Sequence, residues 1–446
     1  MFAIEGDGQG GFFDVVIGNP PYIQLSSIKH DAKRYRNANY DTFNQGSDIY
    51  CLFYEKAYKV SKFNGIVTYI SSNRFCFTNY GINLRSYLGA KDSLILINLN
   101  NVNVFSEANV GTLIYIGQNS QGKNNVIKIA EIETYTDYFD FFGRNSIFLK
   151  VNSKYFKEYQ WSFETNSILS MRHKLLSKGT RLDSLLDIKI NRGITTGAND
   201  IFIIDEKKKE ELFIKDNICN QIIKPVLKGA DIKRWRVLSA TNYIIYSFTG
   251  IEIKIYKPIY EYLESNKAIL ENVYEAKKNL KEWYELRACS YYDSFLQKKL
   301  IWTRLSSVNA FAITDNGEFS VDSTSFATGD NLEYYCCLLN SKLVLFYFRL
   351  GSVKWGADGI KWFGDYFDSI PIVVPNHEMS NLFSRIYKGI VENNVKESLN
   401  DLLVYKLYDL TYDECQIIDP EIGKLISRAD YERMDVEELA EWELSE

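Results

Sequence analysis

The chain has 446 residues, of which 46% are hydrophobic and 24% are charged, and its formal net charge is −5. This composition is ordinary for a globular protein of two or three domains. The chain holds three histidines and seven cysteines, and no two cysteines form a Cys-x-x-Cys pair. This scarcity argues against a zinc site and against a histidine-based hydrolytic triad, so no metal is expected.

The charge is unevenly distributed along the chain. Residues 413–446 hold 12 acidic and 3 basic residues, a net charge of −9, which leaves +4 on residues 1–412. An acidic C-terminal segment therefore follows a mildly basic body, and such a body permits binding to nucleic acid. The odd, unpatterned set of cysteines indicates a reducing cytoplasm. We see neither a signal peptide nor an apolar run of membrane-spanning length, so we expect no membrane contact.

The N-terminal part alternates strands with helices. Four apolar runs predict strands, at residues 13–18, 65–70, 93–99 and 112–116. Residues 47–62 carry apolar side chains at helical spacing, and residues 83–88 predict a short helix. Strands that alternate with helices predict a parallel α/β layer. Residues 1–120 are therefore expected to form part of a doubly wound, Rossmann-like sheet.

The remaining chain changes character after a polar stretch at residues 118–125. We expect residues 121–180 to form a connecting region. Residues 181–377 carry short strand-like segments broken by polar turns, together with two helical stretches, which predicts a separate α+β domain. Residues 378–446 are expected to form a helical C-terminal segment that ends in the acidic tail.

The first predicted strand runs directly into Asn19-Pro20-Pro21-Tyr22. The two prolines lack N–H donors and therefore end the strand. A transferase that acts on an amine of a flat aromatic ring needs fixed acceptors, because the lone pair of this amine is delocalised. The Asn19 side-chain oxygen and a backbone carbonyl could accept its two N–H groups, and the proline pair would hold them rigid. The Tyr22 ring offers a stacking face, and a base of duplex DNA would have to be flipped out to reach it.

With these features, FDVVIGNPPY closely resembles the catalytic motif of the amino-group DNA methyltransferases of the adenine-specific, TaqI-like type. SDIYCLFYEKA, GIVTYISSNRF, NYGINLRSYL and NVFSEANVGTLIYI follow in the order of that family, over about residues 12–118. The resemblance implies that Asn19 and the Pro20 carbonyl hold the adenine amino group, that Pro21 fixes this geometry, and that Tyr22 stacks on the base. Phe105 matches the aromatic residue that the family places against the base. A core phenylalanine at a strand entrance is the alternative for Phe105.

Later segments resemble the target-recognition domain of the same enzymes and of combined, type IIG restriction–modification proteins. They are LDIKINRGITTGANDIFII at residues 186–204 and IIKPVLKGADIKRW at residues 222–235. The resemblance implies double-stranded DNA as a partner, and a glycine-bounded loop with a cation and two hydroxyls suits its phosphates. The residues that we expect to contact DNA are Arg192, Thr195, Thr196, Lys228, Lys233, Arg234 and Lys354. A solvated surface position is the alternative for each single lysine.

Members of this family take the methyl group from S-adenosylmethionine and bind it mainly in the half of the sheet that precedes the Asn-Pro-Pro-Tyr strand. Here twelve residues precede Phe13, and the glycine-rich stretch at residues 6–11 neither follows a strand nor opens a helix. We therefore expect the main cofactor site to be absent, the cofactor-binding residues to be unknown, and the chain alone to be inactive.

Two functions remain open on the sequence alone, beside the weaker alternative that the chain is an aromatic-rich binding protein for another polymer and that Asn-Pro-Pro-Tyr is a coincidence. The first is the C-terminal portion of an adenine-specific DNA methyltransferase from a restriction–modification system, either completed by a separate N-terminal methyltransferase or nuclease polypeptide or truncated by a frameshift or by the choice of start site. The second is a non-catalytic, sequence-specific DNA-recognition module.

Overall fold

The computed structural model describes most of the chain, in two compact units. The described residues are 11–28, 34–99, 102, 104, 111–132, 134–143, 147–157, 160–287, 289–351 and 359–444. The first unit comprises Met1–Ser177 with Leu350–Val353, and the second comprises Lys178–Arg349 with Lys354–Glu446.

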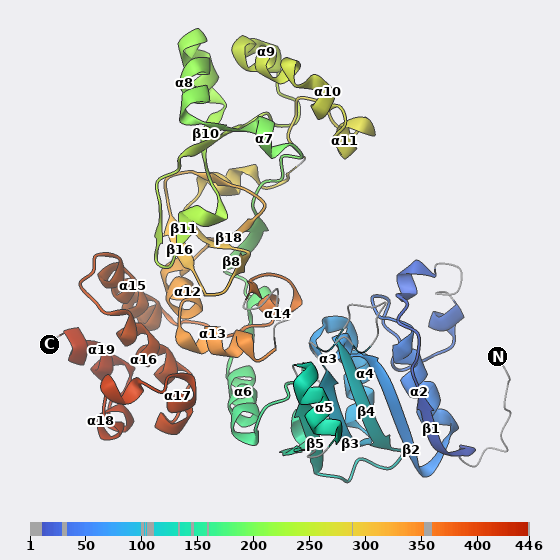
Figure 1. Ribbon diagram of the computed structural model, residues 1–446. Helices are drawn as coiled ribbons and strands as arrows, with labels where there is room; N and C mark the ends of the chain where they lie inside the picture. Colours follow the sequence, from blue (N-terminus) through green and yellow to red (C-terminus); the bar gives the residue numbers. More distant parts are fainter. Residues whose placement is uncertain are drawn as a thin grey trace. The chain divides into compact units, whose positions relative to one another are not determined.

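A six-stranded sheet forms the centre of the first unit. Its strands are β1 (Phe13–Gly18), β2 (Ser61–Ser72), β3 (Asp92–Leu99), β4 (Thr112–Gln118), β5 (Val126–Glu131) and β6 (Leu149–Asn152). They lie in the order β1-β2-β4-β3-β5-β6 (Figure 1). The strands β1, β2, β3 and β5 share one direction, whereas β4 and β6 run antiparallel to their neighbours. The predicted α/β class is confirmed, but the sheet is mixed rather than purely parallel.

The first unit extends further along the chain than the expected boundary at residue 120. The strands β5 and β6 belong to its sheet, and the unit ends at Ser177. The expected connecting region therefore contributes two strands and two helices to this unit. Its helices include α2 (Tyr50–Val60), α3 (Arg74–Phe77), α4 (Ile82–Gly89), α5 (Tyr135–Gly143) and α6 (Asn166–Lys178).

Helices cover both faces of this sheet because apolar side chains alternate along the central strands. Leu96 and Tyr115 point into a core that they share with side chains of α2 and α4. Ile97, which follows Leu96, and Ile114, which precedes Tyr115, belong to a second core together with Phe141 of α5. This period of two places successive residues on opposite faces of a strand. The central strands β3 and β4 are therefore buried on both sides.

Strand β1 differs, because it lies at the edge of the sheet with much of its apolar surface exposed. Val16 packs into the core shared with α2, but on the opposite face Val15 is 55% exposed and Ile17 is 80% exposed. Among the described residues, β1 pairs with β2 alone. The sequence predicts a buried strand, since apolar residues on both faces are typical of a central parallel strand. In the described chain that expectation is wrong for the outer face of β1.

The second unit is built on two four-stranded sheets. One has the order β16-β14-β18-β8 and consists of β8 (Ile188–Arg192), β14 (Lys299–Thr303), β16 (Phe311–Thr314) and β18 (Thr324–Gly329). The other has the order β17-β10-β13-β9 and consists of β9 (Ile203–Asp205), β10 (Ile223–Leu227), β13 (Asn242–Ile245) and β17 (Phe319–Ser320). A common apolar core includes Phe326 of the first sheet and Val226 of the second. The predicted α+β architecture is confirmed.

Short ladders and helices complete the second unit. The two-stranded ladders pair β11 (Ile232–Lys233) with β12 (Arg236–Val237), β15 (Leu305–Ser306) with β19 (Ile360–Lys361), and β20 (Pro371–Ile372) with β7 (Thr180–Arg181). The helices within the domain are α7 (Asn199–Phe202), α8 (Glu206–Lys215), α9 (Lys257–Ser265), α10 (Lys267–Leu270), α11 (Tyr274–Lys277), α12 (Leu332–Leu339), α13 (Lys342–Arg349) and α14 (Asp365–Asp368).

The C-terminal segment is helical, as the sequence predicts. It contains α15 (His377–Val391), α16 (Glu397–Leu407), α17 (Tyr412–Ile418), α18 (Arg428–Arg433) and α19 (Val436–Leu444). The acidic part packs onto the preceding helices rather than standing apart, because Tyr431 and Leu439 are buried and the Tyr431 hydroxyl donates to the Leu410 carbonyl at 2.9 Å. In the part of the chain that the structure describes, no helix combines the length and the apolar character needed to span a bilayer.

Asp401 on α16 makes the stability of the second unit depend on pH. Its carboxylate accepts the Lys342 backbone N–H at 2.7 Å, yet burial raises its pKa to about 6. The folded state thus keeps a proton that the unfolded chain releases near pH 4, so stability falls as pH rises from 4 to 6. We expect Asp401→Asn, whose amide also accepts from Lys342, to gain about 3 kcal/mol over the wild type across this window. Urea unfolding at several pH values measures it, and a gain that is independent of pH would contradict it.

Candidate functional site

The motif Asn19-Pro20-Pro21-Tyr22 follows the last residue of β1, at the edge of the sheet where the parallel strands end. Gly18 lies opposite Tyr69 of β2, and a Cβ at Gly18 would lie 3.1 Å from the Tyr69 ring. Pro20 is buried, whereas Asn19 and Pro21 are exposed. The buried proline thus anchors the turn while the Asn19 amide stays accessible to a ligand.

Tyr22 is held from two sides. Its ring meets Tyr50, the first residue of α2, edge-on with centroids 6.0 Å apart and an interplanar angle of 77°. Its hydroxyl donates to the Ile70 carbonyl of β2 at 3.5 Å. Burial raises the pKa of Tyr22 to about 12, so the phenol is neutral at neutral pH. A neutral, fixed ring suits stacking rather than acid–base chemistry.

The segment after the motif is tied to the start of α2. The Leu25 N–H donates to the Ser47 carbonyl at 3.0 Å, and the Ile49 N–H donates to the Ile23 carbonyl at 2.8 Å. Leu25 is buried beneath this small ladder. These bonds fix the path of the chain on the C-terminal side of Tyr22, so the motif is clamped at both ends.

A polar cluster lies behind Tyr22. The Tyr50 and Tyr80 hydroxyls are 3.1 Å apart, and the Tyr80 hydroxyl donates to an Asp48 carboxylate oxygen at 3.5 Å. Burial raises the pKa of Asp48, while the charge of Arg74 and the Tyr80 hydrogen bond oppose that rise. Asp48 stands beside the predicted helix start in the sequence, but nothing there indicated this cluster.

Three further polar residues gather at the same edge of the sheet. Asn73 follows β2, Asn98 lies near the end of β3, and Glu131 ends β5. The Asn73 amide donates to Asn98 at 2.9 Å, and the Asn98 amide donates to Glu131 at 2.9 Å. Parallel strands end at one edge, where α/β sheets commonly bind ligands. Phe105, the predicted stacking partner in the connection from β3 to β4, lies outside the described residues.

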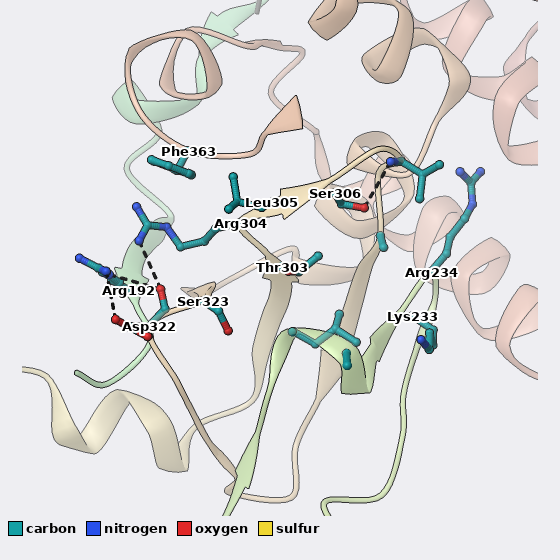
Figure 2. Close-up of a pocket in the computed structure, with 15 residues that line it drawn as sticks. Arg192, Lys233, Arg234, Thr303, Arg304, Leu305, Ser306, Asp322, Ser323 and Phe363 are labelled. Atoms are coloured by element: carbon teal, nitrogen blue, oxygen red, sulfur yellow. Dashed lines mark hydrogen bonds and ion pairs between the residues drawn. The ribbon is translucent and has the colours of Figure 1, made fainter. Parts of the chain in front are cut away.

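In the second unit, three of the predicted DNA contacts come together. Arg192, Lys233 and Arg234 line one cavity of about 820 Å³, although they come from different strands and loops (Figure 2). The Arg192 guanidinium forms an ion pair with the Asp322 carboxylate at 3.3 Å. Arg234 pairs with Glu397 at 2.6 Å and donates to Asn309 at 3.1 Å, so its charge is already engaged.

The other predicted contacts have different surroundings. Lys228 donates to Asn242 at 2.8 Å and borders a smaller cavity of about 360 Å³. Thr195 is half-buried, and Thr196 is fully buried with its hydroxyl 2.6 Å from the Asn199 amide oxygen. The Thr196 side chain therefore holds its own loop together. Lys354 lies outside the described residues.

Two residues of the larger cavity were not singled out in the sequence. The Arg304 guanidinium carbon lies 3.8 Å from the centre of the Phe363 ring, and its Nη1 donates to the Asp322 carbonyl at 3.3 Å (Figure 2). Arg304 directly follows β14. In the sequence, the apolar run Leu-Ile-Trp predicts this strand but does not indicate that the arginine after it lines a cavity. Phe363 is 59 residues away in sequence, so only the fold brings the pair together.

Two family models match separate segments of the chain. Residues 2–105 match the Eco57I restriction-modification methylase model, and residues 224–372 match the TaqI-like C-terminal specificity domain. The type II methyltransferase M.BstVI of Geobacillus stearothermophilus is 23% identical over 432 residues, which cover 91% of this chain and 75% of that protein. The type II restriction enzyme and methyltransferase RM.Eco57I of Escherichia coli is 23% identical over 69% of this chain and 34% of its own length.

One solved structure shares the fold over nearly the whole chain. The type IIL restriction-modification enzyme MmeI, solved in complex with DNA, matches with a TM-score of 0.56 and 13% identity. The match covers 96% of this chain and 57% of that one, so the chain spans little more than half of this relative. The chain is thus similar to type II restriction–modification methyltransferases, with a segment that matches the Eco57I methylase model followed by one that matches the TaqI-like specificity domain model.

Proposed function

We propose that this chain provides the target-base site and the DNA-specificity domain of an adenine-specific DNA methyltransferase from a restriction–modification system. The observation that carries this proposal is the clamped motif at the end of β1. It presents an exposed Asn19 amide beside a buried Pro20 and a fixed, neutral Tyr22 ring. An exposed acceptor next to a stacking face is what a flipped adenine requires.

Each residue of the motif has a defined task in this proposal. The Asn19 side-chain oxygen and the Pro20 carbonyl accept the two N–H groups of the adenine amine. Accepting both bonds draws the nitrogen toward tetrahedral geometry and localises its lone pair for attack. Tyr22 stacks on one face of the base, and Phe105 is proposed for the contact that closes the pocket. With the donor bound, the new N–C bond would form as the bond between the methyl carbon and the donor sulfur breaks, and the nitrogen would release its proton to solvent.

S-adenosylmethionine, when bound, supplies the methyl group as an electrophile. The described residues of the first unit do not fit this cofactor, because none of them forms a glycine-rich turn from a strand of the sheet into a helix. We propose that a separate polypeptide supplies the donor site and docks on the outer edge of β1. The exposed Val15 and Ile17 side chains support this part of the proposal, as does the other edge of β1, which pairs with no strand among the described residues.

Double-stranded DNA is the proposed partner of the second unit. The larger cavity carries four cationic side chains against one carboxylate. Cations gathered on one surface supply the sequence-independent part of DNA affinity through the phosphates.

The deciding experiment is a complementation assay with methylated adenine as the readout. The purified chain is incubated with DNA and S-adenosylmethionine, either alone or with the polypeptide encoded immediately upstream of its gene. We expect N6-methyladenine only in the complemented reaction. Methylation by the chain alone would refute the docking proposal, and sequence-selective binding without methylation after complementation would leave a recognition module.

A further inference from the structure

The backbone around Arg304 is fixed on both sides of the residue. Its N–H donates to the Ser323 carbonyl, and its carbonyl accepts the Trp362 N–H, each at 2.9 Å. Trp362 is buried and its ring stacks on Phe348 with centroids 4.5 Å apart. The loop that carries Phe363 is therefore anchored next to Arg304, and the stack of guanidinium on ring rests on rigid supports.

The Arg304 side chain keeps unused hydrogen-bonding capacity. Among the described residues, its guanidinium donates to the Asp322 backbone carbonyl at 3.3 Å, and its buried Nε–H has no partner there. The neighbouring Asp322 carboxylate pairs with Arg192 instead. Burial and the nearby Arg192 charge lower the pKa of Arg304, and the Asp322 charge opposes this shift.

The other cations of the cavity are placed differently. Arg234 is engaged by Glu397 and Asn309, whereas Lys233 is exposed at the turn between β11 and β12. An exposed lysine is a mobile point charge that suits phosphate. A planar guanidinium held over an aromatic ring has a fixed fork of donors, which matches the O6 and N7 acceptors of guanine in the major groove.

We propose that Arg304 is a specificity-determining residue that reads the edge of a guanine in the bound DNA, with Phe363 as its positioning residue. This inference rests on the proposed DNA-modifying function and adds the base that one side chain recognises. Phe363 holds the guanidinium plane, so less conformational freedom is lost when both hydrogen bonds form.

The test selects bound sequences from a random pool of double-stranded DNA, using the complemented protein described above. Arg304→Lys retains the charge but loses the fork, and we expect preference at one G·C position to fall roughly 5- to 150-fold. Preference at the other positions should persist. Phe363→Ala should relax the same position, whereas Phe363→Trp should retain it, because Trp also offers a ring face.

Lys233→Ala is the matched control within the same cavity. We expect it to weaken DNA binding by the same factor for all sequences. The slope of the logarithm of the association constant against the logarithm of the salt concentration should fall in magnitude by about one. If Arg304→Lys also weakens binding by the same factor for all sequences, Arg304 contacts phosphate and the inference is wrong. The inference is equally wrong if Arg304→Lys unfolds at the wild-type temperature and still selects the wild-type sequence. A wild-type protein that selects no sequence would overturn the proposed function itself.

Discussion

Replacing Asn19 with alanine is expected to lower adenine methylation by the complemented protein at least about 100-fold, the effect of removing one hydrogen-bonding group that acts on a transition state. The reason is that the amide oxygen would accept an amine N–H that becomes more acidic as the nitrogen attacks. Asn19 is exposed after the last residue of β1, so its side chain contributes little to folding, and unfolding should change by less than about 0.5 kcal/mol. The loss should appear in kcat at saturating DNA.

Gln24→Ala is the matched control for this substitution. Gln24 carries another exposed amide, five residues along the same connection, and the proposal gives it no contact with the base. We expect it to methylate DNA at the wild-type rate. Activity that survives Asn19→Ala, or that falls equally in both variants, would remove the motif from the chemistry.

The N-terminal elements could be predicted closely from the sequence because their limits are set by local chemistry. The strand at residues 13–18 coincides with β1, since the proline pair ends it without any help from distant residues. The direction of β4 could not be predicted, because an apolar run is the same for a parallel and for an antiparallel neighbour. Only its pairing with β2 and β3 decides this.

The boundary expected near residue 120 illustrates another limit. The polar stretch at residues 118–125 is a loop inside the first unit, not a linker. Asn119 has a structural reason to be polar, because its amide donates to the carbonyls of Tyr58 and Ser61, both at 3.1 Å. A polar residue that bonds distant backbone looks the same in sequence as a solvated one, so β5 and β6 were missed.

The candidate sites divide in the same way. Asn19 and Tyr22 lie within one tetrapeptide, so sequence alone could single them out. The series of side-chain hydrogen bonds from Asn73 through Asn98 to Glu131 depends on the register of β3 against β5, which no local sequence pattern encodes. Arg304 and Phe363 meet only because the ladder of β15 with β19 brings their segments together.

Replacing Ile17 with lysine should separate folding from assembly with the donor polypeptide. Ile17 is 80% exposed, so the described chain loses little buried surface and unfolding should shift by less than about 0.5 kcal/mol. A lysine on a strand edge opposes further strand pairing, and docking would bury an unpaired charge at a cost of several kcal/mol. We therefore expect complementation to weaken roughly 100-fold or more.

The measurement titrates the donor polypeptide against methylation rate, and Ile214→Lys is its matched control. Ile214 on α8 is 82% exposed, belongs to the second unit, and plays no part in the proposed docking edge. If Ile17→Lys needs more donor polypeptide to reach half-maximal rate while Ile214→Lys does not, the edge of β1 is the docking surface. If both variants need the same amount of donor polypeptide for half-maximal rate, the effect comes from added charge in general. The exposed apolar face of β1 would then not be the docking surface.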